Sequence, residues 1–267
     1  MARLQGDPAG SAAFELDGVT FAIEGRTLLA PLTAAFAPGR VTGLIGHNGS
    51  GKSTLLKLLA RQTTPSGGSV RFGGQPIDAW GARAFARQIA YLPQQPPTAA
   101  GLTARELVAL GRYPWHGALG RVTAADRAAV ARALELTDTV GFADRMVDEL
   151  SGGERQRVWL AMLVAQEARW VLLDEPTSAL DIAHQIEVLS LVRKLSVEHG
   201  LGVVVVLHEV NMAARFCDEL AALRRGALIA RGAPDEIMTK ARLAAIYEVE
   251  MEVIPHPTTG VPVCFAA

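Results

Sequence analysis

A glycine-rich loop, Gly46-His47-Asn48-Gly49-Ser50-Gly51-Lys52-Ser53, matches the pattern G-x-x-x-x-G-K-[ST]. The apolar run 41–45 precedes it, and leucines recur at helical spacing over residues 53–61 after it. Between a strand and a helix, such a loop turns several backbone N–H groups toward one anion, and the helix dipole adds partial positive charge there. The loop therefore predicts an α/β core that binds phosphate, with a chance glycine-rich turn as the minor alternative.

The residues at the end of this loop should carry its chemistry. The Lys52 ammonium is expected to contact the β and γ phosphates of a nucleotide. The Ser53 hydroxyl is expected to bind Mg²⁺, which prefers hard oxygen ligands. Thr54, the next residue, completes the nucleotide-binding set that begins at Gly46.

A second apolar run, residues 170–173, ends in the carboxylates Asp174 and Glu175. Because α/β sheets bind ligands at the carboxyl ends of their strands, both side chains should reach the phosphate loop. Asp174 is expected to complete the Mg²⁺ shell through water, and Glu175 to polarise the attacking water as a general base. Taken alone, an Asp-Glu pair at a strand end would more often be two solvated loop residues. The nearby phosphate loop makes the catalytic interpretation the favoured one.

Composition narrows the classes of protein open to a chain of 267 residues. With 26 Lys and Arg against 27 Asp and Glu, its net charge of −1 provides no basic field, so no nucleic-acid partner is expected. Cys217 and Cys264 lack metal-ligand spacing and are too few for a disulfide framework, which favours reduced thiols in a cytosol. Residues 1–11 lack the features of an export signal, and the longest apolar runs fall far short of the roughly 20 residues that cross a bilayer.

Further strands and helices are predicted around the loop. Residues 14–23 and 27–36 alternate apolar and polar side chains around a Glu24-Gly25 turn, as antiparallel strands do. The remaining patterns predict buried strands at 89–92, 170–173 and 203–207 and helices at 155–166 and 181–199. The predicted fold class is α/β, a phosphate-loop nucleotide-binding core with a mostly parallel sheet and a small antiparallel β layer.

Between residues 95 and 150 helical patterns replace strand patterns, with Thr103 and Thr123 as expected N-caps. An inserted helical subdomain is therefore expected. Its segment 105–132 carries five arginines against Glu106 and Asp126, which predicts either a solvated helical face or a docking surface.

One domain over residues 1–267 is expected, in three parts. The core with its β layer would take residues 1–94 and 158–230, and the helical subdomain residues 95–157. Residues 231–267 would form a C-terminal extension, with a short hairpin after Arg225 and a helix near residues 234–238. The sequence suggests no role for this extension.

The stretch Leu150-Ser151-Gly152-Gly153-Glu154-Arg155-Gln156-Arg157 lies directly before a helical pattern and predicts a second anion-binding helix start. With this stretch, the chain resembles the ATP-binding cassette family, whose signature is LSGGQ or LSGGE, over nearly its whole length. The resemblance implies ATP as the nucleotide and a head-to-tail homodimer. In such a dimer Ser151, Gly152, Gly153 and Glu154 of one chain close over the ATP held by the phosphate loop of the other.

Other motifs of the family occur in the expected order. Gln94 resembles the loop glutamine that reaches Mg²⁺ and the attacking water, and Asp181, in Ser178-Ala179-Leu180-Asp181, resembles the loop that crosses the dimer seam. His208, directly after the apolar run 203–207, resembles the switch histidine that senses the γ-phosphate. Singly, Gln94 would more often be a surface glutamine and His208 a strand-end histidine.

Two positions depart from the family pattern. Ile23 occupies the place where an aromatic residue usually stacks on adenine, so the resemblance implies only apolar contact of Ile23 with the base. Glu209 follows the switch histidine where Asp is commoner, a difference of one methylene.

The segment Gly111-Arg112-Tyr113-Pro114-Trp115-His116-Gly117 resembles the iron–siderophore and vitamin B12 importers of this family, and among them those for ferric hydroxamates. The resemblance implies an ATPase on the cytoplasmic face of the bacterial inner membrane. Its partners would be a separate membrane permease, whose coupling helix would enter a groove near Gln94, and indirectly a substrate-binding protein. Importers of another metal chelate, haem or vitamin B12 are the alternatives.

Two other classes share part of this pattern. Soluble cassette ATPases carry a long coiled-coil insertion or two cassettes in one chain, whereas this chain has one phosphate loop and one signature. Small-molecule kinases with a phosphate loop have no reason to keep the signature. Both are less favoured than the importer subunit.

Overall fold

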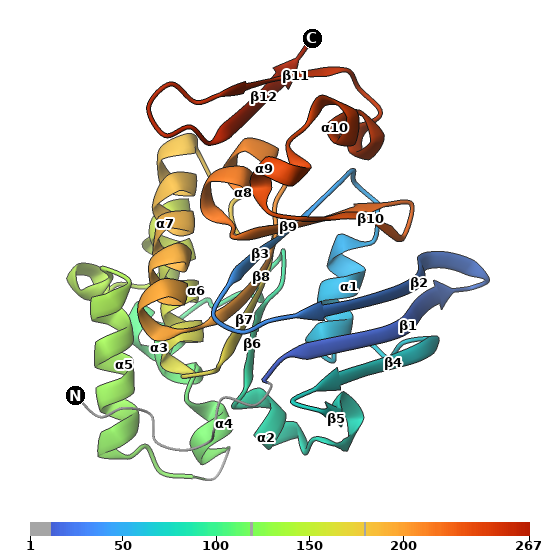
Figure 1. The fold of residues 1–267 in the computed structure, drawn as a ribbon. Helices are drawn as coiled ribbons and strands as arrows, with labels where there is room; N and C mark the ends of the chain where they lie inside the picture. The colour runs from blue at the N-terminus through green and yellow to red at the C-terminus, as the bar shows by residue number, and fades with distance from the viewer. Residues whose placement is uncertain (1–11, 118–119, 179) are drawn as a thin grey trace.

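The computed structural model describes residues 12–117, 120–178 and 180–267. At its centre lies a six-stranded sheet in the order β10-β9-β3-β8-β7-β6 (Figure 1). The strands are β3 (Val41–Ile45), β6 (Ile89–Leu92), β7 (Trp170–Asp174), β8 (Gly202–Val206), β9 (Glu219–Arg224) and β10 (Ala227–Gly232). All neighbours in this sheet run parallel except β9 and β10. The predicted α/β fold class is confirmed.

A smaller antiparallel sheet covers one side of this core (Figure 1). Its order is β2-β1-β4-β5, with β1 (Phe14–Ile23), β2 (Arg26–Phe36), β4 (Gly67–Phe72) and β5 (Gln75–Pro76). The hairpin of β1 and β2 was predicted, whereas β4 and β5 were not. The Phe14 ring connects the two sheets, because its centroid lies 4.9 Å from that of Phe72 and 5.0 Å from that of Trp170.

The parallel sheet buries side chains on both faces, and alternate residues of one strand join different cores. Leu172 packs with helix α1 (Lys52–Leu59) and the antiparallel layer, while its neighbour Leu173 packs with the helices of the opposite face. Those helices are α6 (Gly152–Ala165), α7 (Ile182–His199) and α8 (Val210–Phe216). None of the helices in the described ranges has the length and apolarity needed to cross a membrane.

Between β6 and β7 the described residues form helices, including α3 (Ala104–Leu110), α4 (Tyr113–His116) and α5 (Ala124–Leu136). The predicted N-caps are confirmed: Thr103 and Thr123 each accept a hydrogen bond from the third residue of their helix, and an acidic side chain there bonds back. The predicted boundary between residues 157 and 158 falls inside α6, so this helix belongs to both regions. The division into subdomains stays a prediction.

The arginines of segment 105–132 do not all lie on a surface that could be solvated or bind a partner. Arg112 is buried, with its guanidinium 3.0 Å from Asp126 and 2.7 Å from Glu167, and it also donates to the carbonyl of Ala165. This ion-paired cluster joins α4, α5 and the end of α6. Because both predicted interpretations place the arginines at the surface, they are wrong for Arg112.

The C-terminal part of the chain packs against α8 and the β9–β10 hairpin (Figure 1). It contains α9 (Pro234–Ile237), α10 (Lys240–Tyr247) and a two-stranded sheet of β11 (Met251–Pro255) and β12 (Pro262–Ala266). The hairpin after Arg225 and the helix near residue 234 were predicted, and α10, β11 and β12 were not. Cys217 and Cys264 are both free and buried, as expected of reduced thiols.

Candidate active site

The phosphate loop connects the buried strand β3 to α1, as the sequence predicted. Its glycines Gly46, Gly49 and Gly51 all have positive φ angles, of 133°, 77° and 102°. A side chain at Gly46 would put its Cβ 2.0 Å from the Leu223 carbonyl oxygen, so only glycine fits there. The backbone therefore curls tightly where strand β3 ends and α1 begins, with the first amides of α1 left for an anion.

The Lys52 side chain bends back over this loop and is buried. Its ammonium donates to the carbonyl oxygens of Gly46 and His47, at 2.8 and 2.9 Å. Burial lowers the pKa of Lys52, and the carboxylates of Glu175 and Asp174 act in the opposite direction. This places a cation inside the curl of the loop, where a bound phosphate would replace the two carbonyl contacts.

Ser53 and Asp174 meet at the carboxyl end of β7. The Ser53 hydroxyl donates to Oδ1 of Asp174 at 2.8 Å, and Asp174 is only 2% exposed. Burial raises the pKa of Asp174, and the hydrogen bond from Ser53 partly offsets this. A hydroxyl and a carboxylate at this spacing form a hard-oxygen donor pair that fits Mg²⁺, which also accepts phosphate oxygens and waters.

Glu175 lies between two side chains from neighbouring strand ends. Its Oε2 accepts from Gln94 Nε2 at 2.6 Å, and its Oε1 lies 2.6 Å from His208 Nε2. Gln94 follows β6, Glu175 follows β7 and His208 follows β8, so three adjacent strands deliver the three predicted catalytic residues to one point. Glu175 also has a φ of +52°, a rare conformation for a residue with a side chain and one that tends to occur at functional sites.

One cavity of about 380 Å³ collects most of these groups. It is lined by Leu28, Asn48, Gly49, Gly51, Lys52, Ser53, Thr54, Gln94, Glu175 and His208. His47 and Ser50 lie on the other side of the loop, along a second cavity that Arg224, Arg225 and Glu248 also line. Asn48 and Gly49 line both cavities, whereas Gly51, Lys52, Ser53 and Thr54 line only the first and His47 and Ser50 only the second.

Ile23 is not among the residues that line the inner cavity. It ends β1 opposite Arg26 and is 51% exposed, while Leu28, further along the same hairpin, lines the cavity instead. The predicted contact of Ile23 with a base stays a prediction. Leu28 is a cavity residue that the sequence analysis missed.

The signature residues begin α6 and bond to one another. Ser151 is the N-cap: its hydroxyl accepts from the amide of Glu154 at 3.3 Å, and its own amide donates to Glu154 Oε2 at 2.8 Å. Ser151 and Gly152 are exposed. None of the four signature residues lines the phosphate-loop cavity of the same chain.

Asp181 and the signature are connected through His184, which the sequence analysis did not single out. Asp181 caps α7 by accepting from the amide and the ring of His184, at 2.9 and 2.8 Å. The ring then packs on Gly153, where a Cβ would lie 2.2 Å from it. The Asp-x-x-His spacing at a helix start was the available signal, and Ala179, within the predicted seam-crossing loop, lies outside the described residues.

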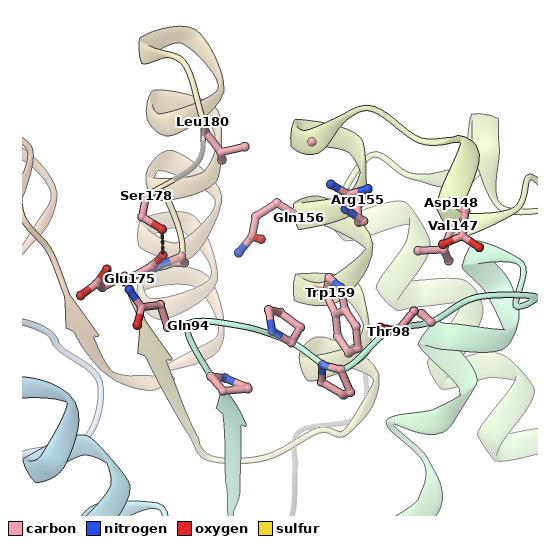
Figure 2. A pocket seen from close by; sticks show the side chains of 16 residues that line it. Gln94, Thr98, Val147, Asp148, Arg155, Gln156, Trp159, Glu175, Ser178 and Leu180 are labelled. Carbon is pink, nitrogen blue, oxygen red and sulfur yellow. Dashed lines mark hydrogen bonds between the residues drawn. The ribbon is translucent and has the colours of Figure 1, made fainter.

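A groove of about 350 Å³ runs between the core and α6 (Figure 2). Gln94, Glu175 and Ser178 lie along one side of it, and Arg155, Gln156 and Trp159 from α6 along the other. Gln94 and Glu175 line both this groove and the phosphate-loop cavity. A molecule in the groove would therefore lie next to two of the predicted catalytic side chains.

Phosphate-loop amides, the Ser53–Asp174 pair and Glu175 between Gln94 and His208 meet at or beside one cavity, as in the ATPase cassette of a transporter. Over residues 29–178 the chain matches the family described as ABC transporter, and it belongs to that family. It binds ATP and is an ATPase.

Among curated relatives, the achromobactin transport ATP-binding protein of Dickeya dadantii is 43% identical over 92% of this chain and 91% of its own length. The iron(3+)-hydroxamate import ATP-binding protein of Bacillus subtilis is 41% identical over 90% of this chain and 89% of its own. Solved structures of the family share the fold of this chain.

A metal-chelate type ABC transporter in an inward-facing conformation gives a TM-score of 0.83 at 25% identity, covering 96% of this chain and 97% of that one. A dimeric cassette bound to ADP and Pi gives 0.71 at 28% identity, covering 82% and 98%.

Proposed function

We propose that this chain is the ATP-hydrolysing subunit of a bacterial importer for a ferric siderophore of the hydroxamate class. The observation that carries the hydrolytic part of the proposal is the convergence of Gln94 and His208 on Glu175 beside the phosphate loop, each 2.6 Å from a different oxygen of the carboxylate. The similarity to siderophore-importing relatives over nearly the whole chain supports the transport role.

In the proposed site, Lys52 and the amides at the start of α1 bind the β and γ phosphates. Ser53 and Asp174, with Gln94, would hold Mg²⁺, which neutralises charge on the phosphates when bound. Glu175 accepts a proton from the attacking water, and His208, now paired with Glu175, is placed to hydrogen-bond the γ-phosphate. Asn48 and Gly49, exposed at the cavity, add backbone contacts to the phosphates.

Two copies of the chain are proposed to close head to tail. Ser151 to Glu154 lie outside the phosphate-loop cavity of their own chain and begin an exposed helix N-terminus, which can approach only a nucleotide held by another chain. The dimeric relative bound to ADP and Pi supports this arrangement. Each site would then need residues from both copies.

The permease is proposed to contact the groove of Figure 2. Its prolines and Trp159 provide apolar surface, and Arg155 and Asp148 provide charges of both signs at its rim. A short permease helix in this groove would touch Gln94 and Glu175, so docking and hydrolysis would be coupled. The protein would lie peripherally on the cytoplasmic face of the inner membrane, with a substrate-binding protein acting only through the permease.

The transported substrate is tested by uptake. The chain is co-expressed in turn with a permease for ferric hydroxamate, for haem or for vitamin B12, in cells that lack their own uptake ATPase. Uptake of the matching labelled substrate is then compared between the three permeases. We expect ATP-dependent uptake of the hydroxamate, lost in Glu175→Gln. Uptake of haem or vitamin B12 with their permeases, and none of the hydroxamate, would reassign the substrate class.

A further inference from the structure

The last part of the chain, residues 240–267, carries none of the motifs assigned above but is built into the core. Leu243, Ile246 and Cys264 belong to the larger core cluster, and none of the three is more than 6% exposed. The segment is therefore packed as part of the core and is not attached to it by a linker alone. Two of its residues also contact elements that flank the nucleotide site: Tyr247 contacts His47 of the phosphate loop, and Cys264 contacts Asn211 of α8.

The first contact is with the outer face of the phosphate loop. A ring nitrogen of His47 hydrogen-bonds the backbone carbonyl of Tyr247, and the two rings pack edge to face with centroids 5.6 Å apart. The next residue, Glu248, pairs with Arg224 and Arg225, which directly precede Gly226 in the turn between β9 and β10. The Gly226 amide donates to the carbonyl of Ser50 in the loop at 3.0 Å.

The Tyr247 phenol is a neutral, half-buried group at this contact. Its buried hydroxyl has no hydrogen-bond partner among the described side chains and backbone. Burial raises the pKa of Tyr247 and the neighbouring Gly46 backbone lowers it; the phenol is neutral near pH 7, as tyrosine ordinarily is, and contributes shape rather than charge beside His47. The contact with the loop thus consists of the Tyr247 ring and carbonyl against His47, and of the ion pairs between Glu248 and the two arginines before Gly226.

The second contact is with the helix that follows the switch histidine. The Asn211 side chain donates to the carbonyl of Cys264 at 2.9 Å and accepts from the Cys264 amide at 2.8 Å. It pairs with β12 as a neighbouring strand would, and α8 packs along the same strand. Asn211 is the second residue of α8 and follows His208 by three residues, so fixing the start of this helix also restricts the position of the histidine.

The phosphate loop follows β3 and His208 follows β8, and these adjacent strands set only the distance between the strand ends. The side chains that must meet one phosphate stand on separate loops beyond those ends. A displacement of about 1 Å in such a group can cost about a hundredfold in rate. A rigid element bonded to both loops would hold their spacing during turnover.

We propose that residues 240–267 form a brace that positions His208 relative to the phosphate loop, with Tyr247 and Asn211 as positioning residues. The inference rests on the proposed ATP-hydrolysing role of the same site. It goes beyond that role because it assigns a catalytic purpose to a segment with no nucleotide motif. A purely structural role is the rival explanation.

The test measures steady-state ATPase kinetics of the full chain with single and double substitutions. Asn211→Ala breaks the contact on the His208 side and should lower kcat about tenfold while the KM for ATP stays within about twofold. Tyr247→Ala breaks the contact on the loop side and, because it releases the same element, should lower kcat to a similar extent and also raise the KM for ATP several-fold. Tyr247→Phe, which keeps the ring and the carbonyl, should restore the KM.

The double variant Asn211→Ala/Tyr247→Ala separates a brace from two local defects. If one element connects the two contacts, breaking either releases it, so the double variant should lose less kcat/KM than the product of the two single losses. Ile254→Ser, an exposed position on β11 of the same segment, serves as the matched control and should keep wild-type kinetics. Circular dichroism before each assay establishes that every variant is folded.

Losses that multiply in the double variant, or single variants with wild-type kcat and KM, would overturn the brace. A kcat/KM that falls only in proportion to the folded fraction would do the same. If Asn211→Ala does not fold, Asn211→Asp keeps an acceptor for the Cys264 amide and should show the same loss of kcat at constant KM. A wild-type chain without ATPase activity would instead contradict the proposed function, which keeps the two failures distinct.

Discussion

Two helix starts of this chain are suited to bind an anion, one at the phosphate loop and one at the signature of α6. They differ in how much of the anion site is formed within a single chain. At the first, Lys52, Ser53, Asp174 and Glu175 are buried or nearly so and already bonded to other parts of the chain. At the second, Ser151 is exposed, and among the described residues its side chain bonds only to Glu154, within its own capping box. One end is assembled by the fold, and the other requires a second molecule.

The largest effect is expected at the assembled end. Glu175→Gln keeps the size of the side chain but removes the proton acceptor, so ATP hydrolysis should fall by about 10²-fold or more while ATP binding is kept. Turnover and binding of a fluorescent ATP analogue measure the two separately. Near-normal hydrolysis would remove Glu175 from the role of base.

The second prediction concerns the incomplete end and uses two inactive chains. Lys52→Ala and Ser151→Ala chains should each be inactive, because each lacks one part of every site. Mixed, they should recover up to about one quarter of wild-type activity, since half of the dimers are mixed and each has one intact site. ATPase activity against mixing ratio measures this, and no recovery would mean that each chain works alone.

A stability effect is expected where the signature meets the Asp181 loop. Gly153→Ala would push a methyl against the His184 ring, and should lower the free energy of unfolding by about 2 kcal/mol. Gly152→Ala is the control, since its nearest atom would lie at 3.7 Å, an ordinary contact. Urea unfolding of both variants checks the difference, and equal losses would show that the ring moves aside freely.

The smallest effect is expected inside the helical region. Hydrogen bonds from the Thr123 side chain and backbone, and then Arg112, hold the pKa of Asp126 at about 2, below its ordinary 3.8. A carboxylate with a lowered pKa stabilises the fold above its unfolded pKa, and this contribution is lost as the pH falls toward the folded value. Asp126→Asn should therefore cost about 1 kcal/mol near neutral pH, from weakened charge-assisted bonds.

The same variant provides its own pH control. Between about pH 5 and pH 3 the gap in unfolding free energy between wild type and Asp126→Asn should narrow, because the wild-type carboxylate begins to take up a proton on unfolding. Denaturant unfolding at a series of pH values measures the gap. A gap that stays constant or widens toward low pH would contradict the assigned pKa shift.

Much of the assembled end could be predicted because its demands are local. The glycines of the phosphate loop and the apolar runs of β3, β7 and β8 each express a backbone requirement within a few residues, as do the capping threonines 103 and 123 of the helical region. Strand β9 is an element that local sequence patterns did not predict. Its sequence, Glu219-Leu-Ala-Ala-Leu-Arg224, suits a helix, and only pairing with β3 and β10 makes it a strand.

From residue order alone, the chain specified its phosphate loop, its signature helix and an α/β core, because short motifs encode the turns and caps that they need. Gln94 and His208 were singled out only through the family resemblance. The tertiary structure decided the rest: Arg112 is buried against Asp126 and Glu167, His184 packs on Gly153, Tyr247 contacts His47, and Asn211 pairs with Cys264. These contacts join residues distant in the chain, so their energies exist only once the sheet has brought them together.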